Sequence, residues 1–203
     1  MTLTREPTET YREDCTSVLV TERLVLRAPR IEDAKIVAAL ANDRRIAENT
    51  LRIPHPYKQA DALQWIAATN KRPGEETFLI WRDDDIVGAC GFDLREGPEP
   101  EIGYWLGAPF WGNGYATEAI RALIDHAFDA EEFEALRAGA RVSNPRSRRV
   151  LEKCGFQWSG VGLYRFHAIN SSAPCDRFRL ERGIWESLKN WGAKSPVFVT
   201  AAE

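Results

Sequence analysis

The spacing of apolar residues predicts one long amphipathic helix in the second half of the chain. From Ala116 onward, apolar residues recur every three or four positions, which places them along one face of a helix. That face consists of Ala116, Ala119, Ile120, Leu123, Ile124, Ala127 and Phe128. The residues directly before it include Gly112 and Gly114. The pattern therefore predicts a glycine-containing loop that runs straight into a helix.

Apolar and β-branched runs with turn residues between them predict a mostly antiparallel sheet around that helix. The first strand is expected over 18–20 and 24–26, and the others at 77–81, 86–94, 101–106, 135–142, 156–166 and 176–180. Three aspartates at 83–85 are typical of a hairpin between the second and third strands. Further helices are expected at 31–41, 59–70 and 145–154. This order predicts an α+β fold, a mixed α/β arrangement with about seven strands and about four helices.

The length of 203 residues is that of one domain with short tails. We expect a flexible, polar lead-in at 1–16, a single domain at 17–192 and a tail at 193–203. Near the end of the chain, Trp185, Trp191 and the apolar segment 196–199 have two interpretations, which are a homodimer contact and packing on the same chain.

Charge and composition exclude several partners. A net charge of −3 and a pI near 5.8 argue against nucleic acid, because phosphate neutralisation requires a basic face. No apolar run approaches the length of a membrane span. Four widely spaced cysteines without a secretory leader predict reduced thiols and a cytoplasmic location. Three scattered histidines give no metal-ligand cluster, so no metal is expected.

The glycine loop has the properties of an anion site. The first turn of a helix leaves backbone N–H groups without intrahelical partners, and the helix dipole makes that end positive. Gly112 and Gly114 carry no Cβ that would keep a ligand away from these groups. A diphosphate fits such a site, although the same residues also suit an ordinary turn.

A second informative stretch spans 144–156. Asn144 suits a helix N-cap, Pro145 the first helical position and Gly155 the position just beyond the helix. Ser147 shares a face with Val150, Leu151 and Cys154. The sequence thus predicts a hydroxyl beside the apolar stripe of this short helix.

Taken together, these two stretches resemble the GNAT family of N-acetyltransferases. The family signature Gln/Arg-x-x-Gly-x-Gly/Ala is matched by residues 111–116, with Trp111 in place of the leading Gln or Arg. Tyr-Trp-Leu at 104–106, Asn-x-x-Ser at 144–147 and Leu-Glu-Lys-Cys-Gly-Phe at 151–156 look like the branch containing ribosomal-protein-alanine N-acetyltransferases. The opening at 21–27 and Asp176 before a late strand are similar to that branch as well. The resemblance covers about residues 18–186.

The resemblance implies a sheet that splays apart after the strand at 101–106, with the pantetheine arm of an acyl-CoA in the gap. The arm would bond to exposed strand backbone at Trp105 and Leu106. The diphosphate would lie on the amides of the loop, which comprises Gly112, Asn113, Gly114, Tyr115, Ala116 and Thr117. Asn144 would reach the pantetheine or thioester, and the basic residues 146, 148 and 149 the adenosine 3′-phosphate. Arg149 is our candidate among them, and a solvated helix face is the alternative.

Acyl transfer to an amine requires a neutral nucleophile and a proton for the departing thiolate. Glu101 is the candidate base, directly or through water; its alternatives are binding a cationic substrate and holding a loop. Ser147 is the candidate proton donor, or a hydroxyl that bonds backbone or cofactor. Much of the family carries a tyrosine where this chain has Leu151, which leaves the general acid open. Tyr104 and Tyr164 are alternative acids whose ordinary role is packing.

Three other types of site fit the sequence less well or differ in function. A dinucleotide site would need glycine or alanine where Thr117 stands, and a P-loop would need lysine in place of Tyr115. A non-catalytic acyl-CoA-binding module is the main alternative in another class.

The resemblance implies an enzyme that moves acetyl from acetyl-CoA to a small-molecule amine or peptide N-terminus. A larger acyl donor such as succinyl-CoA would require a roomier or cationic pocket.

Overall fold

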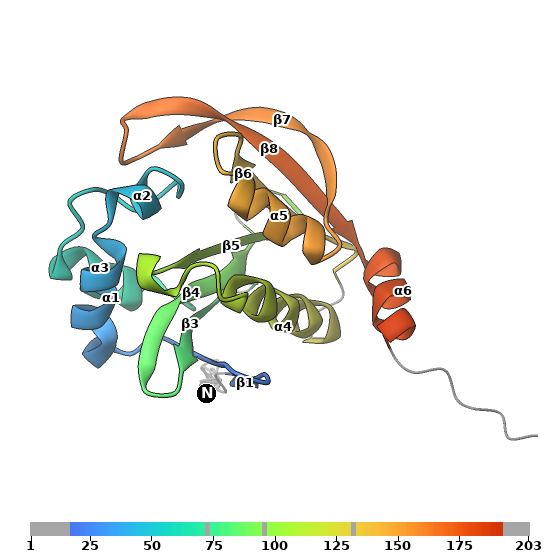
Figure 1. Ribbon diagram of the computed structural model, residues 1–203, viewed down its shortest axis with the longest axis horizontal. Coiled ribbons are helices and arrows are strands. Elements are labelled where there is room, and N and C mark those ends of the chain that lie inside the picture. The colour runs from blue at the N-terminus through green and yellow to red at the C-terminus, as the bar shows by residue number, and fades with distance from the viewer. Residues whose placement is uncertain (1–16, 72–73, 95–96, 131–132, 193–203) are drawn as a thin grey trace, which may run out of the picture.

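The computed structural model describes residues 17–71, 74–94, 97–130 and 133–192. Eight strands form one sheet in the order β1-β2-β3-β4-β5-β6-β8-β7 (Figure 1). The strands are β1 Leu19–Val20, β2 Val25–Arg27, β3 Glu76–Arg82, β4 Asp85–Asp93, β5 Glu101–Leu106, β6 Ala135–Arg141, β7 Gln157–Phe166 and β8 Ser171–Glu181. The helices are α1 Ala34–Ala41, α2 Arg44–Ala47, α3 Gln59–Ala68, α4 Tyr115–Ala130, α5 Pro145–Lys153 and α6 Arg182–Gly192, with 3₁₀ turns at Ile31–Asp33 and Ala108–Phe110.

The sheet opens between β5 and β6. All neighbouring strands pair antiparallel except these two, which run parallel. Their register contains only Glu101 with Arg137 and Ile102 with Ala138, whereas β5 pairs with β4 along all six of its residues. The segment 103–106 of β5 therefore lies beyond the ladder with β6, which confirms the expected splay.

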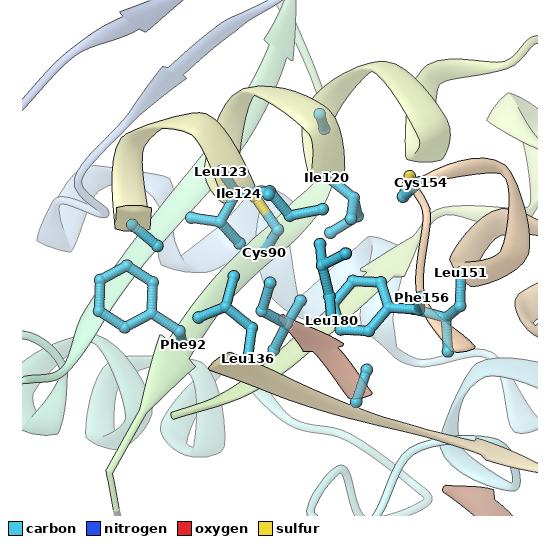
Figure 2. Packing of buried hydrophobic residues seen from close by; sticks show 14 of the residues in the cluster. Cys90, Phe92, Ile120, Leu123, Ile124, Leu136, Leu151, Cys154, Phe156 and Leu180 are labelled. Atoms are coloured by element: carbon cyan, nitrogen blue, oxygen red, sulfur yellow. The ribbon is translucent and has the colours of Figure 1, made fainter. Parts of the chain in front are cut away.

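Helices cover both faces of the sheet, so alternate residues of β3 pack into two different cores. Phe78 and Ile80 belong to a core beneath α4, whereas Leu79 belongs to a second core beneath α1 and α3. Figure 2 shows Ile120, Leu123 and Ile124 of α4 above side chains from β4 and β6. The apolar stripe read from the sequence is the buried face of this helix. Both faces of the central strands are consequently out of water, and α4 is fixed against the sheet along its length.

The sequence-based count of seven strands and four helices was low, for identifiable reasons. The first predicted strand is a small hairpin, in which Leu19 pairs with Leu26 around a turn closed by Thr21 N donating to Leu24 O. Helix α2 is a single turn capped by Asp43, too short to give a periodic pattern. Strand β8 begins at Ser171, five residues earlier than expected, because β7 supplies partners to a segment of low intrinsic strand propensity.

The end of the domain, for which no helix was expected, contains α6, whose Trp185 packs on the same chain. Its ring centre lies 4.9 Å from that of Phe128, and its Nε1 donates to Asp125 Oδ1 at 2.6 Å. For Trp185, the interpretation of packing on the same chain is therefore supported. The expected lead-in at 1–16, the tail at 193–203 and its apolar segment 196–199 lie outside the described residues.

Three of the cysteines, Cys90, Cys154 and Cys175, are free and buried, while Cys15 precedes the described part of the chain. Within the described ranges, no helix combines the length and apolar character needed to cross a membrane.

The core beneath α4 makes a direct prediction about stability. Leu123→Ala removes a side chain with 0% exposure, so it should lower the free energy of unfolding by about 2–5 kcal/mol through lost burial and a residual cavity. Leu163→Ala, at a side chain that is 75% exposed on β7, should change it by no more than about 0.5 kcal/mol. Urea denaturation of both variants provides the comparison. Equal losses would contradict the placement of α4 against the sheet.

Candidate functional site

A groove of about 1640 Å³ lies where β5 and β6 separate. Residues from α1 to α3 form one side, β4 and β5 contribute its middle, and the glycine loop with α5 forms the other side. Nearly all residues singled out from the sequence line it. They are Glu101, Trp105, Leu106, Gly112, Gly114, Tyr115, Ala116, Thr117, Asn144, Ser147 and Arg149.

Asn113 is the one residue of the expected phosphate loop 112–117 that does not line the groove. Its side-chain Nδ2 donates to Phe110 O at 3.2 Å and to Trp111 O at 3.3 Å, so the amide group closes the loop on itself. Any contribution of Asn113 to ligand binding therefore belongs to its backbone.

The glycine loop adopts the left-handed backbone that its sequence suggests. Gly112 and Gly114 both have φ of +82°, a region that residues with a Cβ rarely adopt. The first bond of α4 runs from Glu118 N to Gly114 O at 3.1 Å. The backbone N–H groups of the residues before Glu118 therefore have no acceptor within the helix. Most of these residues line the groove. The arrangement is suited to an anionic ligand.

A carboxylate in the first turn of α4 ties this loop to the β1–β2 hairpin. Glu118 accepts hydrogen bonds from Thr21 Oγ1 at 2.6 Å, from Arg23 N at 2.8 Å and from Arg23 Nε at 2.8 Å. Arg23 Nη1 also donates to Asn113 O at 3.1 Å. Burial opposes the charged form of Glu118, but these hydrogen bonds outweigh it and lower the pKa of the carboxyl. These bonds hold the loop in place, and the charge of Arg23 reduces the repulsion between the Glu118 carboxylate and a bound anion.

Trp111, at the leading position of the loop signature, connects three elements. Its Nε1 donates to Leu106 O at 2.8 Å, at the end of β5. The guanidinium carbons of Arg45 from α2 and Arg146 from α5 lie 5.2 and 5.7 Å from the indole ring centre. Arg45, Trp111 and Arg146 all line the groove. Trp111 stands where the family signature has Gln or Arg, and its ring holds two cations beside the loop.

Helix α5 begins and ends as its sequence predicts. Asn144 Oδ1 accepts from Ser147 N at 3.2 Å, which makes Asn144 the N-cap. At the other end, Gly155 has φ of +90°; Gly155 N donates to Glu152 O and Phe156 N to Leu151 O, a Schellman motif. These caps fix the direction of α5 and therefore the position of Ser147 beside the groove.

Ser147 has a partner that the sequence did not reveal. Its Oγ lies 2.8 Å from Tyr104 Oη, and Tyr104 Oη also lies 3.2 Å from the carbonyl oxygen of Ser147. Burial raises the pKa of Tyr104, and the hydrogen bond with Ser147 only partly offsets this effect. The two residues are 43 positions apart, so no local pattern could have joined them.

The basic residues of α5 divide between two tasks. Arg146 and Arg149 line the groove. Arg148 instead pairs with Glu152 at 2.9 Å and with the buried Asp176 of β8 at 3.4 Å. Only part of the cluster is thus available to a ligand in the groove.

Glu101 begins β5 and is the first of the two residues through which β5 pairs with β6. Its Oε1 would be 3.6 Å from a Cβ at Gly139, so the small residue on β6 leaves room for the carboxylate. Asp93 lies opposite it on β4 and forms an ion pair with Arg52 at 3.0 Å. Sequence reasoning missed the aromatic and charged groove residues from the helical side, because 44–65 carries no chemical motif.

Cys154 is a packed thiol on the inner side of α5. Its Sγ lies 3.7 Å from Thr117 O, and burial raises the pKa of the thiol to about 11. It is a poor nucleophile near neutral pH because the reactive form is the thiolate.

Comparisons with known proteins agree with this geometry. The acetyltransferase (GNAT) domain matches residues 23–157. The N-acetyltransferase p20 of Bacillus licheniformis is 30% identical over 149 residues, which cover 70% of this chain and 84% of the relative.

Two solved structures share the fold. The microcin C7 self-immunity acetyltransferase MccE, in complex with acetyl-CoA and AMP, has a TM-score of 0.70 and 23% identity, covering 79% of this chain and 93% of that one. The ribosomal L7/L12 α-N-protein acetyltransferase RimL, in complex with coenzyme A, has a TM-score of 0.73 and 18% identity, covering 81% and 98%.

The contact between Glu118 and the β1–β2 hairpin predicts a pH-dependent stability. The folded-state pKa lies below the ordinary value of 4.5, so the ionised carboxylate stabilises the fold above that pH and the contribution is lost as pH falls through the lowered pKa. Glu118→Gln should therefore cost about 1.5–3 kcal/mol at pH 7, and the deficit should shrink in acid. Chemical denaturation at pH 7 and pH 3 measures it. Glu152→Gln, at an exposed pair, should cost less than about 1 kcal/mol. A Glu118→Gln deficit that is the same at both pH values would contradict the role of the charge.

Proposed function

This chain belongs to the acetyltransferase (GNAT) family of acyl-CoA-dependent enzymes, and we propose that it transfers acetyl from acetyl-CoA to a primary amine by direct attack in a ternary complex. The observation that supports this most strongly is that one groove joins a helix N-terminus suited to phosphates with a carboxylate and a hydroxyl suited to proton handling. The acceptor is a protein N-terminus or a small-molecule amine. We also propose a cytoplasmic location, which the three free thiols favour.

The acyl donor fits the side of the groove that is formed by the loop and α5. Amides of residues 112–117 would take the diphosphate, because they lie at the positive end of α4 without helical partners. The segment 103–106 of β5 would bond to the pantetheine through Trp105 and Leu106, since it lies beyond the ladder with β6. Asn144 would contact the same arm, and Arg149 with Arg146 would neutralise phosphate charge. The thioester supplies an acyl carbon that is open to attack by a neutral amine.

Glu101 is the residue we assign to the proton of the attacking amine, either directly or through water. An amine nitrogen that bonds to the acyl carbon acquires a positive charge, and a carboxylate at the mouth of the gap can accept its proton. Ser147 is assigned to the sulfur that departs as the carbon–sulfur bond breaks. The balance is an amide, free coenzyme A and one proton moved from nitrogen to sulfur.

The acceptor fits the other half of the groove, where carboxylates are more numerous. Asp61, Glu75, Asp93 and Glu101 line this side, and the groove arginines on it are paired, Arg45 with Asp43 and Arg52 with Asp93. Three further cations that line the groove, Arg146, Arg149 and Lys153, come from α5 on the donor side. This division of charge favours an amine acceptor opposite an anionic donor.

Binding of the acyl donor is tested by comparing a substitution at a loop glycine with the same substitution at a glycine outside the groove. Gly112→Ala should raise the dissociation constant of coenzyme A roughly tenfold or more, because a methyl group would face the ligand where amides need close approach. Gly97→Ala is the control, since Gly97 also has positive φ and open space around its Cβ position but does not line the groove. Titration calorimetry with coenzyme A gives both values. Equal weakening by the two changes would contradict the loop as the phosphate site.

Turnover is tested at Glu101. Glu101→Gln should lower kcat about 10²- to 10⁴-fold, because the amide cannot accept the proton, while coenzyme A binding stays within about twofold. Glu32→Gln, at an exposed carboxylate away from the groove, should retain full activity. The assay follows thiol release with small amines and N-terminal peptides. A wild-type protein that binds coenzyme A but acetylates no amine would favour a binding module, and an unimpaired Glu101→Gln enzyme would remove the base assignment.

A further inference from the structure

The hydroxyl groups of Tyr104 and Ser147 meet inside the groove. Tyr104 lies on the part of β5 beyond the ladder with β6, and Ser147 is the third residue of α5. Their oxygens are 2.8 Å apart and both residues line the groove. The contact therefore bridges the two elements between which the pantetheine arm is proposed to lie.

The position of one hydrogen decides what Ser147 can offer a ligand. Tyr104 Oη is within reach of two acceptors, Ser147 Oγ at 2.8 Å and Ser147 O at 3.2 Å. If Tyr104 donates to the carbonyl, Ser147 can turn its own hydrogen toward Tyr104 Oη. If Tyr104 donates to Ser147 Oγ, Tyr104 already supplies the hydrogen between the two oxygens, and the hydrogen of Ser147 is free to bond to another acceptor. A negatively charged sulfur in the groove would favour the second arrangement.

Tyr104 is better suited to hold a proton than to release one. Tyr104 packs partly buried against the core, and this burial raises its pKa and disfavours the phenolate. A free thiol has a pKa of about 8.5, so a departing thiolate is already a moderately stable anion that gains from a fixed hydrogen-bond donor. The physical need at this point is orientation of the Ser147 hydroxyl.

We propose that Tyr104 is a positioning residue, whose hydroxyl donates to Ser147 Oγ and thereby directs the Ser147 hydrogen toward the thiolate of coenzyme A. This inference rests on the proposed function. Both hydroxyls keep their hydrogens throughout; the carbon–sulfur bond breaks with its electron pair on sulfur, and sulfur gains the proton that the amine nitrogen loses, through Glu101 or solvent.

Helix α5 gives no other hydroxyl at this place, which strengthens the assignment. Leu151, where much of the family has tyrosine, has 0% exposure and packs in the core. Asn144 fixes the backbone of Ser147 but not the rotation of its hydroxyl. Tyr104 Oη is the side-chain atom that lies within hydrogen-bond distance of that hydroxyl, at 2.8 Å.

A double-mutant cycle with two readouts tests the proposal. Tyr104→Phe, Ser147→Ala and the double variant are compared with Ser171→Ala, a control that removes an exposed hydroxyl at the start of β8 outside the groove lining. The first readout separates kcat from KM for acetyl-CoA. The second is the pKa of the coenzyme A thiol in the binary complex, followed by thiolate absorbance across pH.

The expected result is non-additive. Tyr104→Phe should lower kcat roughly tenfold with KM within about twofold, since one oriented hydrogen bond is lost. The double variant should match Ser147→Ala, and all three should raise the pKa of the bound thiol by a similar amount. Ser171→Ala should change neither readout.

Other outcomes separate this inference from the proposed function. Losses in kcat that multiply in the double variant, or a bound-thiol pKa that only Ser147→Ala changes, would overturn the role of Tyr104 and leave the transferase intact. A shared shift of the bound-thiol pKa without acetyl transfer to any amine would sustain the Tyr104–Ser147 pair and remove the proposed function.

If Tyr104→Phe does not fold, Tyr104→3-fluorotyrosine keeps the ring and provides a stronger hydrogen-bond donor. A tenfold loss of kcat in that variant would overturn the inference.

Discussion

The two-residue ladder between β5 and β6 is the constraint on which the rest of the site depends. Backbone N–H and C=O groups removed from water need partners, and a parallel neighbour would ordinarily supply them. Here the pairing ends after Ile102, while β6 continues to pair with β8 over seven positions. The remainder of β5 therefore presents backbone groups to a groove, and the loop before α4 and the start of α5 border the same opening. One break in the sheet places an extended backbone, a helix N-terminus and two proton-handling side chains together.

Charge around the loop is arranged so that a negative ligand meets little repulsion. Glu118 lies in the first turn of α4, where a carboxylate stabilises the helix but would oppose a bound phosphate. Thr21 and Arg23 engage both of its oxygens. Arg146 beside Trp111 adds positive charge from α5. A protein with a net charge of −3 can in this way keep a locally favourable site for an anion.

The parts of the fold and site that the sequence predicted are those with local signatures. The apolar stripe of α4 has a period that only a helix satisfies, β5 was bounded correctly at 101–106, and Asn144 and Gly155 mark the ends of α5 through their own backbone preferences. Contacts between distant segments were not predictable in this way. Arg23 and Glu118 are 95 positions apart, and the bond between Tyr104 and Ser147 exists only because β5 and α5 are neighbours in space. Likewise, the division of the basic residues of α5 depends on Asp176 from β8.

Helix α4 is held at both ends by segments from opposite ends of the described chain. The β1–β2 hairpin grips its first turn through Glu118, and α6 grips its last turns, where Trp185 bonds to Asp125 and Arg182 Nη1 donates to Phe128 O at 2.8 Å. During synthesis on the ribosome, the hairpin emerges long before α4 and α6 well after it. It follows that the hairpin can contact the first turn of α4 before translation of this domain ends, whereas the contacts at the last turns of α4 can form only after α6 has left the exit tunnel.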